Sequence, residues 1–216
     1  MGVSIAILGL GKYGRSLAEN MYKLGADVLV VDKNPVLIDD FSGKVNSAIC
    51  ADMTNEAEIN ELGLGNLDVV VVAMGSNLEA TILSVAVAKE KGVGFVMAKT
   101  SSDRMSSILT KVGVDKIIDP EEESGLRTAR ILASGRVMDY IDMDGNLCMV
   151  EIKPKKKWIN HSLMELDIRK SDNINIVAMK SGKEKWAFPD PQKMITESTS
   201  LMAILDKKDL RNVQQG

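Results

Sequence analysis

The stretch VSIAILGLGKYGRSLA (residues 3–18) decides the fold of this chain. Its apolar first part predicts a strand, the pattern G-x-G-x-x-G predicts a tight turn, and a helical pattern begins directly after the turn. Gly9 allows the turn, Gly11 lets the backbone approach phosphate groups, and Gly14 lets the helix pack closely on the sheet. The free N–H groups at the start of that helix favour an anion. The stretch therefore predicts the first strand, turn and helix of a nucleotide-binding domain.

An acidic residue lies at the end of the next predicted strand. Asp32 follows Gly14 by eighteen residues, the position from which a carboxylate accepts hydrogen bonds from ribose hydroxyl groups. Its negative charge would repel a 2′-phosphate and so disfavours NADP, although the adjacent Lys33 weakens that inference. The alternative is a glycine-rich turn that binds no ligand.

Three further strand ends carry candidate groups. Asp52 follows the third predicted strand, where it can meet an adenine amino group; its alternative role is to cap the helix that begins near Asn55, which Thr54 also fits. The small-residue segment 73–77 follows the fourth strand and leaves room for a nucleotide. Lys99, at the end of the fifth strand, is either a base or a contact for a phosphate or carboxylate. All these loops lie at the carboxyl ends of parallel strands, where such sheets bind ligands.

Outward from the turn, short strand-like runs alternate with helical stretches as far as residue 133. The predicted strands are 3–8, 27–31, 47–50, 67–73, 94–98 and 116–118, and the predicted helices lie near 12–24, 35–42, 55–63, 77–91, 101–113 and 121–134. This alternation predicts a Rossmann-like, doubly wound parallel α/β sheet. We assign residues 1–135 to this nucleotide-binding domain.

The regular alternation of strands and helices ends at Gly135, and the pattern of residues 136–216 predicts a small α+β domain. Its predicted strands are 137–143, 147–153, 174–180, 185–188 and 201–205, with a short helix around 162–168. Asp144-Gly145 between the first two is a hairpin signal. The lysine triplet 155–157 predicts a solvated loop, with a binding patch as the alternative.

Composition excludes several classes of protein. Of the 216 residues 45% are hydrophobic and 26% charged, and 27 basic against 30 acidic residues give a net charge of −3. There is no overall basic footprint for nucleic acid, and no apolar run approaches the ~18 residues needed to cross a membrane. No basic segment followed by an apolar one precedes the first strand, so we expect a cytoplasmic rather than a secreted protein.

Catalytic side chains are scarce. His161 is the single histidine, and we expect it to cap or pack near the short helix rather than to catalyse. Cys50 and Cys148 have apolar neighbours and are expected to be buried, reduced thiols. A phosphate-binding G-x-x-x-x-G-K-[ST] sequence is absent. The nucleotide is therefore expected to act as a signal and not as a reactant.

The helix expected over 121–134 is a candidate lever. Its pattern places Leu126, Ala129 and Ala133 on one face, with Arg127 and Arg130 beside it. That apolar face predicts either ordinary core within the domain or a contact between subunits.

Segments 7–18, 30–34, 51–54, 71–77 and 113–121 together resemble the KTN/RCK regulatory proteins of bacterial potassium transport, which are subunits of the Ktr and Trk systems. The second domain looks like the RCK C-terminal module of that family, with Asp190-Pro191 and the closing run 201–205. The resemblance covers nearly the whole chain, whose length is similar to the single-repeat Ktr type. It implies an RCK N-terminal domain of Rossmann type followed by an RCK C-terminal domain.

The resemblance also implies a nucleotide site. ATP or ADP, or NAD(H), would bind with its phosphates at the turn 9–14, its ribose at Asp32 and its adenine near Asp52 and Met53. The expected nucleotide-binding residues are Gly9, Leu10, Gly11, Lys12, Tyr13, Gly14, Asp32, Lys33, Asn34, Asp52, Met53, Ala73, Met74, Gly75, Ser76, Asn77, Lys99 and Glu121. No catalytic residue is expected.

Three finer assignments follow from the same resemblance. Lys12 occupies the position of a family arginine that reaches γ-phosphates across the dimer. Glu121 matches an acidic residue beside the phosphates that can hold a divalent cation, Mg²⁺ or Ca²⁺; alternatively, with its acidic neighbours, it stabilises a helix N-terminus. In the second domain, Ile174, Asn175 and Pro191 lie in the region where some relatives bind cyclic di-AMP.

The implied assembly is a dimer-based octameric ring at the inner face of the membrane. It would dock beneath a potassium translocation subunit of the KtrB or TrkH type and gate it in response to nucleotide. The first functional hypothesis is therefore a regulatory subunit that is not an enzyme. The alternative is a small NAD(H)-dependent oxidoreductase; a redox-sensing repressor ranks third, because no helix-turn-helix with a basic recognition helix is visible.

Overall fold

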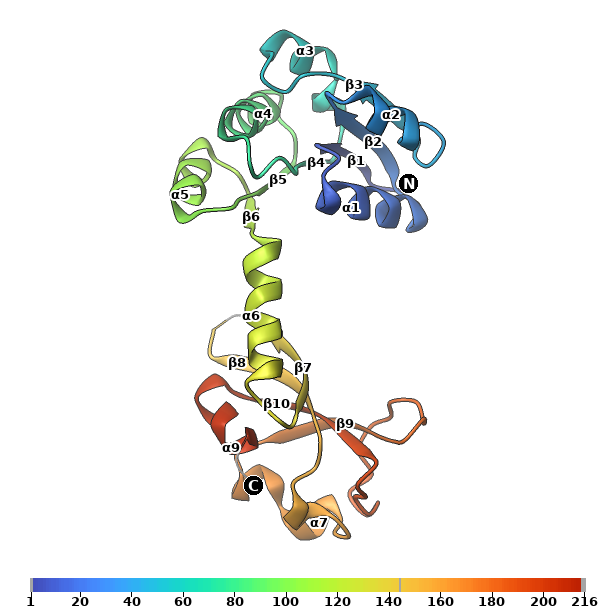
Figure 1. Ribbon diagram of the computed structural model, residues 1–216, viewed down its shortest axis with the longest axis vertical. Coiled ribbons are helices and arrows are strands. Elements are labelled where there is room, and N and C mark those ends of the chain that lie inside the picture. The colour runs from blue at the N-terminus through green and yellow to red at the C-terminus, as the bar shows by residue number, and fades with distance from the viewer. Residues whose placement is uncertain (1, 144, 215–216) are drawn as a thin grey trace. The chain divides into compact units, whose positions relative to one another are not determined.

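The computed structural model describes residues 2–143 and 145–214, which form two compact units that divide between Glu121 and Glu122 (Figure 1). Each unit has its own hydrophobic core. None of the helices within the described ranges is long and apolar enough to cross a membrane.

The first unit contains a six-stranded sheet in the order β3-β2-β1-β4-β5-β6, and every neighbouring pair is parallel. The strands are β1 (Ser4–Leu8), β2 (Asp27–Asp32), β3 (Ser47–Cys50), β4 (Val69–Val72), β5 (Phe95–Lys99) and β6 (Lys116–Ile118). The helices are α1 (Lys12–Lys23), α2 (Pro35–Phe41), α3 (Glu56–Glu61), α4 (Leu78–Glu90) and α5 (Asp103–Val112). This confirms the predicted Rossmann-like, doubly wound α/β class.

The central strand β1 shows why helices cover both faces of this sheet. Ile5 and Ile7 are buried in one core together with residues of α1 and α2. Ala6 and Leu8 are buried in the other core, together with residues of α3, α4 and α5. Because alternate side chains of a strand point to opposite faces, an apolar run of this kind is stable only when both faces are covered.

The second unit contains an antiparallel sheet in the order β7-β8-β10-β9. Its elements are α6 (Pro120–Leu132), which begins at the division, β7 (Val137–Asp142), β8 (Leu147–Ile152), α7 (Leu163–Leu166), α8 (Ile168–Ser171), β9 (Asn175–Ser181), β10 (Thr199–Asp206) and α9 (Leu210–Gln214). Trp158 and Tyr140 are the largest fully buried side chains of its core. This confirms the predicted small α+β domain.

Several local predictions are wrong. No strand forms over 185–188; Ala187 makes only an isolated bridge with Met179, and Phe188 is 91% exposed, so no sheet face buries it. Cys50 is exposed rather than buried, because the edge strand β3 leaves it uncovered, whereas Cys148 is buried as expected. Of the predicted Asp144-Gly145 turn, Asp144 lies outside the described residues.

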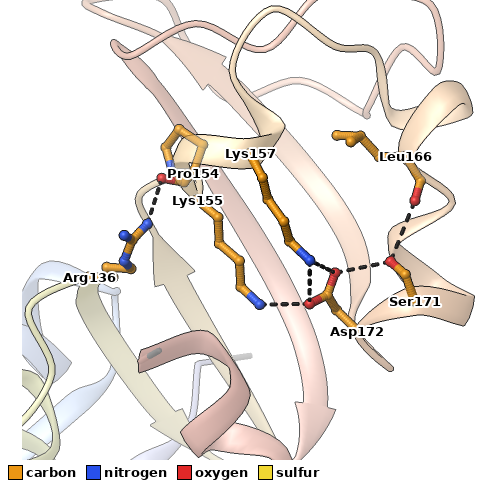
Figure 2. Close-up of polar contacts among 7 residues, drawn as sticks. All are labelled: Arg136, Pro154, Lys155, Lys157, Leu166, Ser171 and Asp172. Atoms are coloured by element: carbon orange, nitrogen blue, oxygen red, sulfur yellow. Dashed lines mark hydrogen bonds and ion pairs between the residues drawn. The ribbon is translucent and has the colours of Figure 1, made fainter. Parts of the chain in front are cut away.

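The lysine triplet is not a uniformly solvated loop. Lys155 is buried, and its Nζ lies 2.6 Å from Asp172 Oδ1. Figure 2 shows Lys155 and Lys157 both directed at Asp172, which also accepts a hydrogen bond from Ser171. Only Lys156 and Lys157 are exposed, as a solvated loop predicts.

The division between the compact units falls inside helix α6, whose residues from Glu122 onward belong to the second unit. The helix begins at Pro120, and its salt bridge from Arg127 to Asp139 joins it to β7. The assignment of residues 1–135 and 136–216 to two functional domains stays a prediction, because the division at Glu121 describes packing alone.

Candidate functional site

The glycine turn between β1 and α1 has the backbone that only glycine adopts easily. Gly9 has φ 104°, and a Cβ there would lie 2.6 Å from Met74 Cγ. A Cβ on Gly14 would overlap the carbonyl oxygen of Gly9, whereas a Cβ on Gly11 would meet open space. Gly9 and Gly14 thus have the predicted turn and packing roles, and the backbone at Gly11 is accessible from outside.

The N-terminus of α1 is open to an anion. Gly11 is the N-cap and offers no side-chain hydrogen bond, and the first turn contains no acidic residue. The first N–H groups of a helix have no partner within the helix, and they carry its partial positive charge. Lys12 is exposed, Tyr13 is half-buried and Leu10 is buried.

Asp32 connects the end of β2 to this turn. Its Oδ2 accepts a hydrogen bond from the Leu10 amide at 2.7 Å, and its Oδ1 accepts one from the Asn34 amide at 2.9 Å. A carboxylate has about four acceptor positions, so Asp32 retains capacity for hydroxyl groups. Lys33 beside it is exposed, and Asn34 caps α2 by accepting from Val36.

Asp52 lies in the loop after β3. Its Oδ1 accepts hydrogen bonds from the amide and the hydroxyl of Thr54, both at 2.9 Å. These bonds, with the nearby charge of Lys33, hold the pKa of Asp52 below its usual value. The cap of α3 is Asn55, so the alternative in which Asp52 or Thr54 caps this helix is wrong. The Asp52 carboxylate therefore stays ionised at the surface of the loop.

A hollow of about 120 Å³ joins the ends of β2, β3 and β4. Its lining residues are Asp32, Lys33, Ala51, Asp52, Met53, Met74, Asn77 and Ala80. Six of these eight were predicted from the sequence. Ala51 and Ala80 were missed; their signal is a small side chain next to a predicted site residue, which is too common to stand out.

The other predicted residues are not among those that line this hollow. Gly75 approaches the Lys99 side chain, and its carbonyl accepts a hydrogen bond from the Ser101 hydroxyl at 2.8 Å, a contact not predicted. Ala73 is buried and Ser76 is exposed. Asn77, which does line the hollow, also caps α4.

Lys99 and Glu121 form an ion pair. The distance from Lys99 Nζ to Glu121 Oε1 is 2.7 Å, and this hydrogen bond lowers the pKa of the Glu121 carboxyl. Of the two roles expected for Lys99, the structure thus shows a contact with a carboxylate. Within the described ranges no three His, Cys, Asp or Glu side chains gather as a metal cluster.

His161 has no catalytic surroundings. It is exposed, its Nδ1 lies 3.1 Å from the Ile159 carbonyl oxygen, and the cap of α7 is Ser162, which forms a capping box with Glu165. The predicted capping role therefore belongs to the next residue.

Comparison with known proteins identifies the family. Residues 5–120 match the family model of the TrkA-N domain. The chain is 32% identical to Ktr system potassium uptake protein C of Bacillus subtilis (strain 168), over 100% of this chain and 97% of that protein. It is also 32% identical to Ktr system potassium uptake protein A of Vibrio alginolyticus, over 86% and 84% of the two chains. These relatives are named as parts of potassium uptake systems and not as enzymes.

Solved structures share the fold. The GsuK RCK domain matches with a TM-score of 0.68 and 15% identity over 99% of this chain and 47% of that chain. The GsuK channel bound to NAD matches with a TM-score of 0.66 and 15% identity over 99% and 39%. This protein thus spans less than half of those chains. The match to the family model and the 32% identity to Ktr proteins show that this chain belongs to the TrkA-N family, among the Ktr potassium uptake proteins.

Proposed function

We propose that this protein is a nucleotide-sensing regulatory subunit of a potassium transporter. One observation carries the proposal: the Leu10 amide, in the turn directly before the uncapped N-terminus of α1, donates to the Asp32 carboxylate, and Asp32 lines the same hollow as Asp52 and Met53. Phosphate, ribose and adenine each have a chemical counterpart there. The relatives belong to potassium uptake systems, and GsuK has been solved with NAD and with ADP.

The proposed nucleotide pose uses the residues of this chain as follows. The amides that follow Gly11 bind the phosphates, and Lys12 adds a positive charge. Asp32 accepts hydrogen bonds from the ribose hydroxyls with the lone pairs that Leu10 and Asn34 leave free. Met53 provides an apolar face for adenine, and Asp52 accepts from its amino group. ATP, ADP and NAD(H) all contain these parts.

The structure favours a limited role for a divalent cation. Glu121 offers one carboxylate, and Lys99 holds it at 2.7 Å. Mg²⁺ in nucleotide sites takes one or two carboxylates and completes its shell with phosphates and water. A cation at Glu121 would therefore need the nucleotide's phosphates and the displacement of Lys99, and we propose that Mg²⁺ or Ca²⁺ binds only together with nucleotide.

We place a second nucleotide, cyclic di-AMP, in the second unit. Leu163, Asp167, Ile168, Arg169, Ile174, Asn175 and Ile176 line a hollow of about 160 Å³ there. Pro191 is not among the lining residues; its carbonyl oxygen accepts a hydrogen bond at 3.0 Å from the amide of Met164, which follows the lining residue Leu163. Isoleucine side chains offer apolar contact to a base, and Arg169 offers a donor fork to a phosphate.

Self-association would connect the nucleotide site to a transporter. We propose a dimer-based octameric ring at the cytoplasmic face of the membrane, docked on a potassium translocation subunit. In support, no residue of α6 is buried among the described residues, and Leu126 and Leu132 are 46% and 80% exposed. Leu126, Ala129 and Ala133 are all exposed, so the alternative in which this apolar face of α6 is core within the domain is wrong. A nucleotide shifts such a ring only by its difference in affinity for two states, typically about 1–3 kcal/mol per site.

The test is ligand-dependent thermal unfolding of the full chain with ATP, ADP, NAD, NADH and cyclic di-AMP, with and without Mg²⁺. Ligand at about 100 times Kd adds about 2.7 kcal/mol, which raises the midpoint by several degrees. Asp32→Arg should abolish the shifts caused by ATP, ADP, NAD and NADH and keep the shift caused by cyclic di-AMP. Asp27→Arg, at the exposed opposite end of β2, is the matched control and should keep all of them.

Two results would contradict the proposal. Unchanged shifts with ATP, ADP, NAD and NADH in Asp32→Arg would show that the ribose assignment is wrong, and the absence of a shift with every nucleotide would remove the sensor function. Transport is tested separately, by co-expression with a Ktr-type membrane subunit in cells that lack potassium uptake. Growth at low potassium should require this chain and fail with Asp32→Arg.

A further inference from the structure

A second, basic hollow lies on the second unit, away from the residues assigned to cyclic di-AMP. Its volume is about 330 Å³. It is lined by Gly135, Arg136, Lys153, Pro154, Lys156, Ile159 and Glu197. The backbone holds two of its cations together, because the Lys153 amide donates to the Arg136 carbonyl at 3.0 Å.

The Arg136 guanidinium is oriented before any ligand binds. Its Nη1 donates to the Pro154 carbonyl oxygen at 3.0 Å, and Figure 2 shows the side chain directed at that oxygen. A guanidinium has five N–H donors, so most of them are left for another acceptor. Pro154 is buried and Ile159 half-buried, which gives the hollow a partly apolar wall.

The charge of this hollow is not balanced. Among the described residues no carboxylate forms a salt bridge with Arg136, Lys153 or Lys156. Glu197 is the single acidic residue in the lining. The neighbouring Lys155 and Lys157 differ, since both are paired with Asp172. Three cations against one carboxylate leave a local excess of positive charge.

We propose that this hollow binds a phosphate-bearing anion. The free N–H groups of Arg136 hold two phosphate oxygens as a fork, and Lys153 and Lys156 neutralise the remaining charge. Gly135 has open space where a side chain would stand, so an oxygen can approach the backbone there. The same chemistry suits a free phosphate compound and a lipid headgroup.

The probe is pyrophosphate, measured by isothermal titration calorimetry on the full chain. All variants carry Gly11→Asp, which keeps a good helix cap but repels phosphate from the α1 N-terminus. Arg136→Gln and Lys156→Gln should each weaken pyrophosphate binding at least tenfold. Glu197→Gln should strengthen it several-fold, because it removes the opposing charge. Lys183→Gln is the matched control: it removes an exposed lysine that forms no salt bridge with any described residue, and it should change nothing.

The proposal would be overturned if Arg136→Gln and Lys183→Gln bound pyrophosphate with the same affinity, whether both kept the original affinity or both lost it. Lys156 is exposed, so Lys156→Gln keeps the test valid if Arg136→Gln fails to fold. Co-sedimentation with phosphatidylglycerol vesicles, compared with phosphatidylcholine vesicles, identifies the source of the phosphate. If Arg136→Gln loses binding to the phosphatidylglycerol vesicles and Lys183→Gln retains it, the ligand is a lipid headgroup. Absence of both pyrophosphate and vesicle binding overturns the site. In a chain that carries Arg136→Gln but not Gly11→Asp, the thermal-midpoint shifts caused by nucleotide should be unchanged. Failure of this anion site is therefore distinguishable from failure of the nucleotide-sensing function.

Discussion

At the scale of single residues, one carboxylate in the second unit neutralises two lysines. Asp172 lies 2.6 Å from Lys155 and 3.5 Å from Lys157, and the side chains of Asp172 and Lys155 are 8% and 6% exposed. Lys155 also lies over the Trp158 ring, with Nζ 5.2 Å from the centroid. A buried ion pair adds little net stability, but removal of one partner leaves an uncompensated buried charge.

Asp172→Asn is therefore expected to lower the free energy of unfolding by about 3 kcal/mol. Urea denaturation followed by tryptophan fluorescence measures this, because Trp158 and Trp186 both lie in the second unit. Asp167→Asn is the control, since its salt bridge with Lys170 is exposed and exposed pairs contribute little. Asparagine also tolerates the left-handed backbone of Asp167. Similar losses in both variants would contradict this account.

The same pair predicts a pH dependence. Burial raises the pKa of Asp172, but the hydrogen bonds and charges of Lys155, Ser171 and Lys157 together lower it below its usual value. A group whose pKa is lowered by folding binds more protons in the unfolded state, so its contribution is present above the unfolded pKa of about 3.9 and is lost as the pH falls through the folded pKa. The difference in unfolding free energy between the wild type and Asp172→Asn should thus be constant from pH 7 to 5 and narrow below about pH 4. Urea titrations at pH 7, 5, 4 and 3 test this, and a difference that widens in acid would contradict it.

At the scale of elements, two glycines inside helices have opposite consequences. Gly14, in the first turn of α1, has no room for a Cβ beside the Gly9 carbonyl, whereas Gly125, inside α6, has open space around it. Gly14→Ala should destabilise the first unit by about 3 kcal/mol, because α1 must move off the sheet. Gly125→Ala should stabilise α6 by about 0.5–1 kcal/mol.

Thermal unfolding of Gly14→Ala and Gly125→Ala, followed by circular dichroism in the same buffer, measures both changes in stability. Because the substitution is the same, helix propensity favours alanine in each case. A stabilised Gly14→Ala would show that the packing of α1 on β1 does not require glycine. A destabilised Gly125→Ala would show that the exposed face of α6 is covered by a subunit contact that needs a small residue.

At the scale of the whole molecule, the two units have separate cores. The cores around β1 contain residues of the first unit only, and the core around Trp158 contains residues of the second. We expect two unfolding transitions, one for each unit. Saturating ATP, ADP or NAD should raise the midpoint of the first unit and leave that of the second unit, which tryptophan fluorescence reports, in place. Circular dichroism and tryptophan fluorescence, recorded on the same samples, test this. A single transition that nucleotide moves equally by both probes would mean that the units unfold together.

Local sequence determined the first unit almost completely. Its strands and helices begin and end within a few residues of their predicted limits, because β-branched runs, caps such as Asn77 and the glycine turn act over short distances. The candidate site was predictable for the same reason: a parallel sheet brings the residues that follow its strands to one edge. Asp32 and Asp52 were found in this way.

Only the tertiary structure decided the environments of individual side chains. The burial of Lys155, the exposure of Cys50, the pairing of Lys99 with Glu121 and the unbalanced charge around Arg136 each depend on segments far apart in the chain. The sequence of the lysine triplet does not reveal whether the carboxylate seventeen residues after Lys155 faces that lysine or faces solvent. Sequence patterns indicate which face of a helix or strand is apolar, whereas the burial and charge pairing of a side chain depend on the neighbouring elements that pack against that face.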